Sequence, residues 1–119
     1  MVQLDPISGE VHFVDQSGKV SWVGKPLGCA ASAVLPVVGA ADAVVLLDPD
    51  AHMKEPFRNL VRISAGGAVI WRAELPGRTD DAYVAVRFDG IQLQANTWSG
   101  YLVTLDIDSG RVLEATFTK

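Results

Sequence analysis

The sequence has 119 residues, of which 49% are hydrophobic and 20% are charged. This length suits one domain, residues 1–119, and excludes enzymes that join a cofactor domain to a substrate domain. The formal net charge is −4 and no two lysines or arginines are adjacent, which argues against a nucleic-acid partner because phosphate binding needs a basic patch.

The sequence carries no sign of export or membrane insertion. Cys29 is the single cysteine, so no internal disulfide is expected. The N-terminal residues lack a charged segment followed by an apolar one. The longest weakly polar stretch, residues 27–41, contains Pro36 and Gly39 and is shorter than the roughly 20 residues of a membrane helix. We therefore expect a cytoplasmic protein without a membrane partner.

Glycine-containing turns divide the sequence into short apolar runs. Such turns are typical of β-hairpins, because glycine supplies positive φ and Ser or Asp bonds to the local backbone. The runs predict strands near 2–5, 10–15, 19–23, 33–38, 43–48, 59–64, 68–75, 83–88, 91–96, 101–106 and 111–117. Residues from Cys29 to Val34 could instead begin a short helix, and Pro36 restricts a strand there to an edge or a bulge.

Apolar residues alternate with polar ones along most of these runs. Period two with one apolar face is typical of antiparallel strands that pack on one side. The residues expected to share apolar faces are Val69, Trp71, Ala73 and Leu75; Val84, Val86 and Phe88; Ile91, Leu93 and Ala95; and Tyr101, Val103, Leu105 and Ile107. The predicted fold class is therefore all-β, an antiparallel meander of about ten strands.

One hairpin pattern recurs along the chain. Val2–Val11 has the same arrangement as Val103–Val112, with an aspartate before a Ser-Gly turn and a valine after it. Val61–Val69 is a version one residue shorter. Gly67 and Gly110 lie 43 positions apart, close to the roughly 40–45 residues of a four-stranded propeller blade.

The segments 59–71 and 99–113 resemble the repeats of quinoprotein-type β-propellers, the first including its closing tryptophan, Trp71. Residues 43–119 also resemble short uncharacterised bacterial proteins with Leu-Leu-Asp-Pro, Trp-Ser-Gly-Tyr and terminal Phe-Thr-Lys segments, a resemblance that suggests an immunity-type role. These resemblances imply propeller-like hairpin repeats. Since a closed propeller needs at least about four blades, we expect a sandwich or partial propeller, without the quinone cofactor.

Residues with catalytic or metal-binding chemistry are few. The two histidines and the cysteine do not have the spacing of metal ligands. His12 is predicted to face solvent, and Cys29 is expected to be a small buried residue. His52 lies in a separate loop. The acidic loop 48–57 lacks the central glycine of a calcium-binding loop. The sequence therefore predicts no enzyme, no cofactor and no metal.

The candidate binding site consists of the polar connection that contains Asp48 to Phe57, the polar connection that contains Asp80 and Asp81, and the turn beside Trp98. Loops vary without loss of fold, carboxylates steer basic partners, and aromatic residues act as anchors. Trp98 could alternatively cover the end of a sheet. The candidate partner-binding residues are Asp48, Asp50, Glu55, Phe57, Asp80, Asp81 and Trp98.

These features predict a non-catalytic protein-binding module, most concretely a cytoplasmic immunity protein that binds and blocks a cognate, basic bacterial toxin. Two alternatives remain: a self-assembling protein whose copies complete a propeller-like ring, and a small-molecule binder at a sheet end near Trp98.

Overall fold

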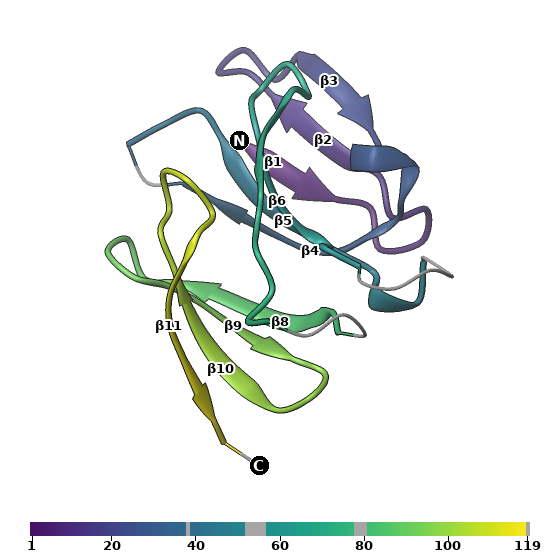
Figure 1. The fold of residues 1–119 in the computed structure, drawn as a ribbon. Helices are drawn as coiled ribbons and strands as arrows, with labels where there is room; N and C mark the ends of the chain where they lie inside the picture. The colour runs from purple at the N-terminus through teal and green to yellow at the C-terminus, as the bar shows by residue number, and fades with distance from the viewer. Residues whose placement is uncertain (38, 52–56, 78–80, 119) are drawn as a thin grey trace.

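Three antiparallel sheets make up the computed structural model, which describes residues 1–37, 39–51, 57–77 and 81–118 (Figure 1). Within these residues there are eleven strands and two short 3-10 turns, Pro26–Gly28 and Pro49–Ala51. The strands are β1 Val2–Leu4, β2 Val11–Val14, β3 Val20–Gly24, β4 Ala31–Pro36, β5 Ala43–Leu47, β6 Leu60–Ile63, β7 Val69–Arg72, β8 Tyr83–Phe88, β9 Leu93–Thr97, β10 Tyr101–Leu105 and β11 Val112–Phe117.

Each sheet is formed by strands that follow one another in the chain. The sheets contain β1–β3, β4–β7 and β8–β11, and every strand pair is antiparallel. The all-β prediction is confirmed. The possible helix after Cys29 is instead strand β4, which pairs with β5 from Ala31 to Pro36 with a bulge before Ala33.

The β4–β7 sheet lies between the other two, and its strand β5 is buried on both faces. All five residues of β5 are buried, which explains its unbroken apolar sequence. One face of β5 contributes Val44 and Leu46 to the C-terminal core, which it shares with β8–β11. The other face contributes Val45 to the N-terminal core, which it shares with β1–β3. The chain is thus a stack of three sheets around two cores.

Two tryptophans join neighbouring sheets by packing on glycines. The ring of Trp22, in the middle of β3, covers Gly67 in the β6–β7 turn, and a Cβ at Gly67 would lie 2.2 Å from that ring. Trp71, at the end of β7, covers Gly110 in the β10–β11 turn, where a Cβ would lie 2.6 Å from the ring. Both glycines also have positive φ, so glycine is required twice over.

Trp71 is 7% exposed, which confirms its predicted core position. Other predicted positions were wrong. A bulge between Tyr83 and Ala85 shifts the register of β8, so Tyr83 is buried and Val84 is exposed. Ile91 lies in the β8–β9 turn before the strand begins at Leu93, and it is 90% exposed.

His12 and Cys29 also differ from expectation. His12 lies on the face of β2 opposite Val11 and Phe13, as its parity predicts, yet its side chain is half-buried rather than open to solvent. Cys29 is half-buried rather than enclosed, and its sulfur lies 3.6 Å from the Leu27 carbonyl oxygen. Among the residues placed by the structure, no helix is long and apolar enough to cross a membrane.

Candidate protein-interaction site

Three chain connections meet at one end of the stacked sheets: β5–β6, β7–β8 and the β9–β10 turn. Phe57 donates its amide to the Asp81 carbonyl oxygen at 3.2 Å, and Trp98 donates its amide to the Ala82 carbonyl oxygen at 2.9 Å. The described parts of these connections lie on the same side of the molecule in Figure 1. We call residues 97–101 and Asp81, at this end, the Trp98 tip. The structure thus brings together Phe57, Asp81 and Trp98, three of the predicted site residues.

The carboxylate of Asp81 holds the Trp98 tip in place. Asp81 is 2% exposed, and its oxygens accept hydrogen bonds from the Ser99 amide at 3.1 Å, the Ser99 hydroxyl at 2.5 Å and the Ala82 amide at 3.0 Å. Asp81 was predicted to make steering and rim contacts, whereas in the structure these donors enclose its carboxylate. Asp81 is instead a positioning residue for the turn that carries Trp98.

Thr97 adds a second set of bonds to the same turn. Its buried hydroxyl accepts the Tyr101 amide at 3.0 Å and lies 3.0 Å from the Ser99 hydroxyl. The backbone on either side of Trp98 is therefore fixed by side chains. Trp98 itself is 69% exposed, so most of its surface is in contact with solvent although the turn that carries it is constrained.

Asn59, directly before β6, forms hydrogen bonds with the end of β5 and the start of β8. Its buried side chain donates to the carbonyl oxygens of Leu47 at 2.9 Å and Tyr83 at 2.7 Å, and accepts the Tyr83 amide at 2.8 Å. The Tyr83 hydroxyl donates to the Glu74 carbonyl oxygen. Burial raises the pKa of this phenol, and the nearby charges of Asp81 and Glu74 raise it further.

Sequence patterns did not single out Asn59, Thr97 or Ser99. An asparagine before an apolar run and a Thr or Ser beside a glycine usually indicate turns. One feature of the sequence could have identified Asn59. It directly precedes the apolar run that begins at Leu60, and a polar side chain that is buried beside such a run needs hydrogen-bond partners.

The other predicted site residues have different environments. Phe57, predicted to supply a buried anchor for a partner, is 3% exposed and packs instead in the N-terminal core of this chain. Asp48 is half-buried and accepts the Asp50 amide at 2.9 Å, while Asp50 is exposed. Glu55 and Asp80 lie outside the described residues.

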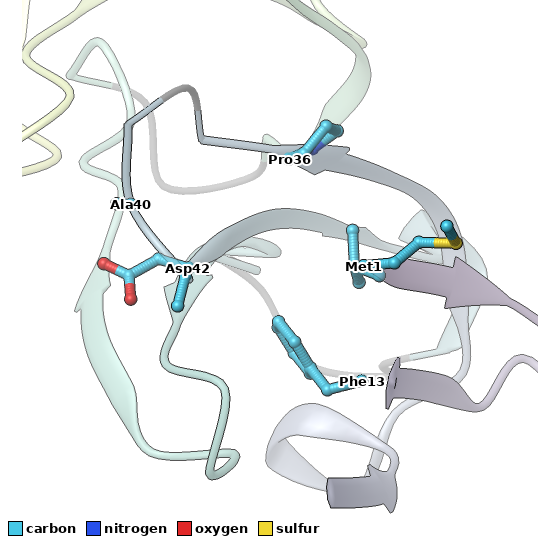
Figure 2. A pocket seen from close by; sticks show the side chains of 7 residues that line it. Met1, Phe13, Pro36, Ala40 and Asp42 are labelled. Atoms are coloured by element: carbon cyan, nitrogen blue, oxygen red, sulfur yellow. The ribbon is translucent and has the colours of Figure 1, made fainter. Parts of the chain in front are cut away.

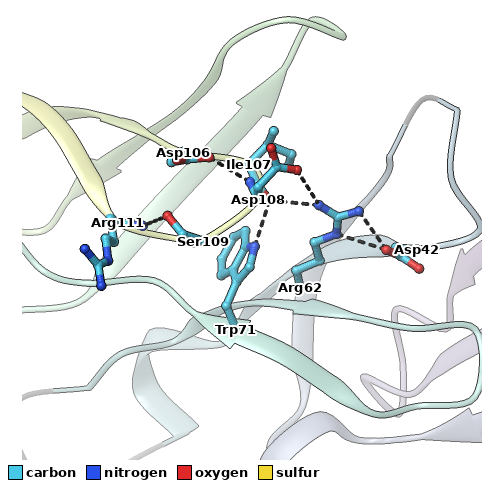
Figure 3. A network of polar contacts seen from close by, with 8 residues as sticks. All are labelled: Asp42, Arg62, Trp71, Asp106, Ile107, Asp108, Ser109 and Arg111. Atoms are coloured by element: carbon cyan, nitrogen blue, oxygen red, sulfur yellow. Dashed lines mark hydrogen bonds and ion pairs between the residues drawn. The ribbon is translucent and has the colours of Figure 1, made fainter.

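The opposite end of the sheets is occupied by internal polar contacts (Figure 3). The Arg62 guanidinium pairs with Asp42 at 2.7 Å and donates to the Ile107 carbonyl oxygen at 2.8 Å. The Trp71 indole donates to the same carbonyl at 2.8 Å. These bonds connect the β4–β7 sheet to the β10–β11 turn, so we assign these residues a structural role.

A small hollow lies near the N-terminus (Figure 2). Its volume is about 70 Å³, well below the roughly 300 Å³ of small ligand sites. Its one charged residue, Asp42, already pairs with Arg62. The lining residues are Met1, Val2, Phe13, Pro36, Ala40, Ala41 and Asp42.

Two solved structures share this arrangement of sheets. The chain aligns over its full length with BamB from Moraxella catarrhalis, a β-propeller protein, with a TM-score of 0.69 and 21% identity. It aligns over 99% of its length with the computationally designed Ika8 protein, with a TM-score of 0.68 and 14% identity. The chain spans about a third of each structure, 32% and 33%. These similarities establish a propeller-like fold.

No curated protein matches the chain. The sequence model of one protein family, described as a domain of unknown function (DUF7957), matches residues 32–117, which include the β4–β7 and β8–β11 sheets together with the Trp98 tip. Because this match covers most of the sequence, the chain belongs to the DUF7957 family.

Proposed function

We propose that this protein is a non-catalytic protein-binding module that contacts its partner through the Trp98 tip. The observation that carries the proposal is a 69% exposed tryptophan on a turn fixed by the buried Asp81 carboxylate. Tryptophan is among the residues that most often dominate binding energy at protein interfaces. A turn that is already ordered loses less conformational entropy on binding than a flexible one.

The acidic residues near this end favour a basic partner. Asp50 is exposed and follows β5, and the sequence places Glu55 and Asp80 in the two connections that reach the tip. Together with the net charge of −4, these carboxylates would speed association with a positively charged surface.

More concretely, we propose that this protein is a cytoplasmic immunity protein that occludes the active site of a cognate bacterial toxin. Small size, acidic balance and the resemblance to short bacterial immunity-type proteins support this form. The general proposal of a binding module is supported by the exposed Trp98 on its constrained turn, and it holds whether or not the partner is a toxin.

The general proposal is tested by affinity capture from the source organism, followed by binding measurements with the purified partner. Trp98→Ala should weaken that binding by more than about tenfold, the loss typical of an interface hot spot. Ile91→Ala is the matched control, because it removes an even more exposed apolar side chain from the opposite end. Equal binding by wild type and Trp98→Ala would refute the assignment of the tip.

The toxin form is tested separately by expressing the captured partner alone and together with this protein. The partner alone should stop growth, and co-expression of wild type but not Trp98→Ala should restore it. A partner that is harmless when expressed alone would contradict the immunity role and leave the binding module in place.

A further inference from the structure

The β1–β2 hairpin brings three metal-ligating side chains together. Asp5 and Glu10 flank the turn, and His12 follows on β2 with the same parity as Glu10. One ligand atom from each side chain lies within 4.8 Å of the others, and all three residues are half-buried. Spacing along the sequence gave no sign of this trio, because it is completed by carboxylates rather than by the second histidine or the cysteine.

The hairpin turn itself needs only one of these residues. Asp5 Oδ1 accepts the Ile7 amide at 2.9 Å and the Ser8 amide at 3.4 Å, and the Asp5 backbone bonds to Glu10 and Gly9. The β10–β11 turn repeats this pattern. Its Asp106 bonds in the same way to the Asp108 amide and to the backbone of Arg111 and Gly110.

Arg111 thus occupies, in the second turn, the position that Glu10 occupies in the first. Both turns form with the same backbone bonds, so the fold does not require a carboxylate at residue 10. Glu10 bonds through Oε1 to the Ser8 hydroxyl at 3.3 Å, a contact that leaves its second oxygen available as a ligand.

A further observation concerns the imidazole of His12. Its Nε2 atom is enclosed and has no hydrogen-bond partner in the structure. A buried polar atom without a partner is uncommon and calls for an explanation. An imidazole beside two carboxylates offers an ordinary ligand for zinc, and an ion bound through Nε2 would give that atom a partner.

We propose that Asp5, Glu10 and His12 bind one Zn²⁺ ion, with solvent completing the coordination. The imidazole favours zinc over Mg²⁺ or Ca²⁺, which take oxygen ligands and need more of them than this hairpin offers. The ion would stabilise the β1–β2 hairpin, whose Gly9 packs directly against Ala30, the residue before β4. This site lies outside the Trp98 tip and does not depend on the proposed function.

The test is calorimetric titration of the chelator-treated full chain with ZnCl₂, together with thermal unfolding. The wild type should bind one equivalent and unfold at a higher temperature when zinc is present. Glu10→Arg, which installs the residue of the matched turn, and His12→Gln should each weaken binding by more than about tenfold, since even outer-shell changes cost that much.

Two control variants address other zinc ligands. Cys29→Ser removes the thiol, and Glu114→Gln removes an exposed carboxylate from β11; both should bind zinc as the wild type does. Absence of binding, binding unaffected by Glu10→Arg, or binding lost in Cys29→Ser would each overturn the site. Glu10→Arg decides the result if His12→Gln does not fold.

Discussion

Single side chains of the same type have different roles in this protein, and tryptophan shows this best. The ring of Trp71 is enclosed in the C-terminal core and donates to the Ile107 carbonyl oxygen. The ring of Trp98 is largely exposed on its turn. Alternation along β7 identified the first as a core residue, whereas the sequence left the second open between a packing role and a binding role.

Trp71→Ala should lower the free energy of unfolding by about 3–5 kcal/mol, as expected when a large aromatic side chain leaves a cavity. Trp98→Ala should lower it by less than about 1 kcal/mol, because most of its surface is already in water. Urea unfolding followed by circular dichroism compares the two variants. Similar losses for both would contradict the assigned positions.

Asp81→Ala should destabilise the protein by about 1–3 kcal/mol, because the Ser99 and Ala82 donors would lose a buried acceptor. Amide hydrogen exchange at residues 97–101 should also become faster. Asp50→Ala, which removes an exposed carboxylate from the same end, should change stability by no more than about 0.5 kcal/mol. An Asp81→Ala protein as stable as Asp50→Ala would show that the carboxylate does not hold the tip.

At the scale of elements, local patterns predicted the strands well and their contacts poorly. Period-two alternation and glycine turns are local properties, so the strands were predicted close to their observed bounds. The bulge that exposes Val84 depends on pairing with β9, and the packing of Trp22 on Gly67 joins two sheets. Contacts between distant segments leave no periodic signal in a single sequence.

The candidate site was predicted in part for the same reason. The loops that carry Phe57, Asp81 and Trp98 were identified by their length and polarity, and the structure places them at one end. The burial of Phe57 and Asp81 follows from packing partners that come from other sheets and loops. Sequence position alone could not distinguish these two residues from the exposed Asp50.

The hairpin turns also make stability depend on pH. Hydrogen bonds from Ser17 and Lys19 lower the pKa of Asp15, and amide bonds from Gln92 and Ile91 lower the pKa of Asp89. Both carboxylates therefore bind protons less readily in the folded state than in the unfolded state. Their stabilising effect is present above the ordinary aspartate pKa of 3.8 and is lost as the pH falls below it.

The urea midpoint should accordingly fall as the pH is lowered from 5 through about 4 towards 3. Asp15→Asn with Asp89→Asn should flatten this dependence, because neither asparagine titrates. An unchanged slope in the double variant would assign the acid sensitivity to other carboxylates.

At the scale of the whole molecule, the three sheets differ in how many faces they bury. The β4–β7 sheet is covered on both sides, whereas the outer face of β8–β11 carries a cross-strand row of Arg87, Gln94, Thr104 and Glu114. A polar face does not favour the stacking of another sheet. This arrangement argues against ring completion by copies that pack on β8–β11.

The protein alone should therefore elute from a sizing column as a monomer, with a mass by light scattering near 12.7 kDa. The mass should not rise with concentration, since association through β8–β11 would desolvate its polar row. A stable dimer or larger ring would instead support the alternative of self-assembly.

Hydrogen exchange of this protein with and without its captured partner tests the central claim, binding through the Trp98 tip, most directly. The account predicts that the partner slows exchange at residues 97–101 and in the adjoining β7–β8 connection. Exchange in the β8–β9 turn around Ile91, at the opposite end, should stay unchanged. Protection confined to that turn or to the outer face of β8–β11, with none at the tip, would contradict the account.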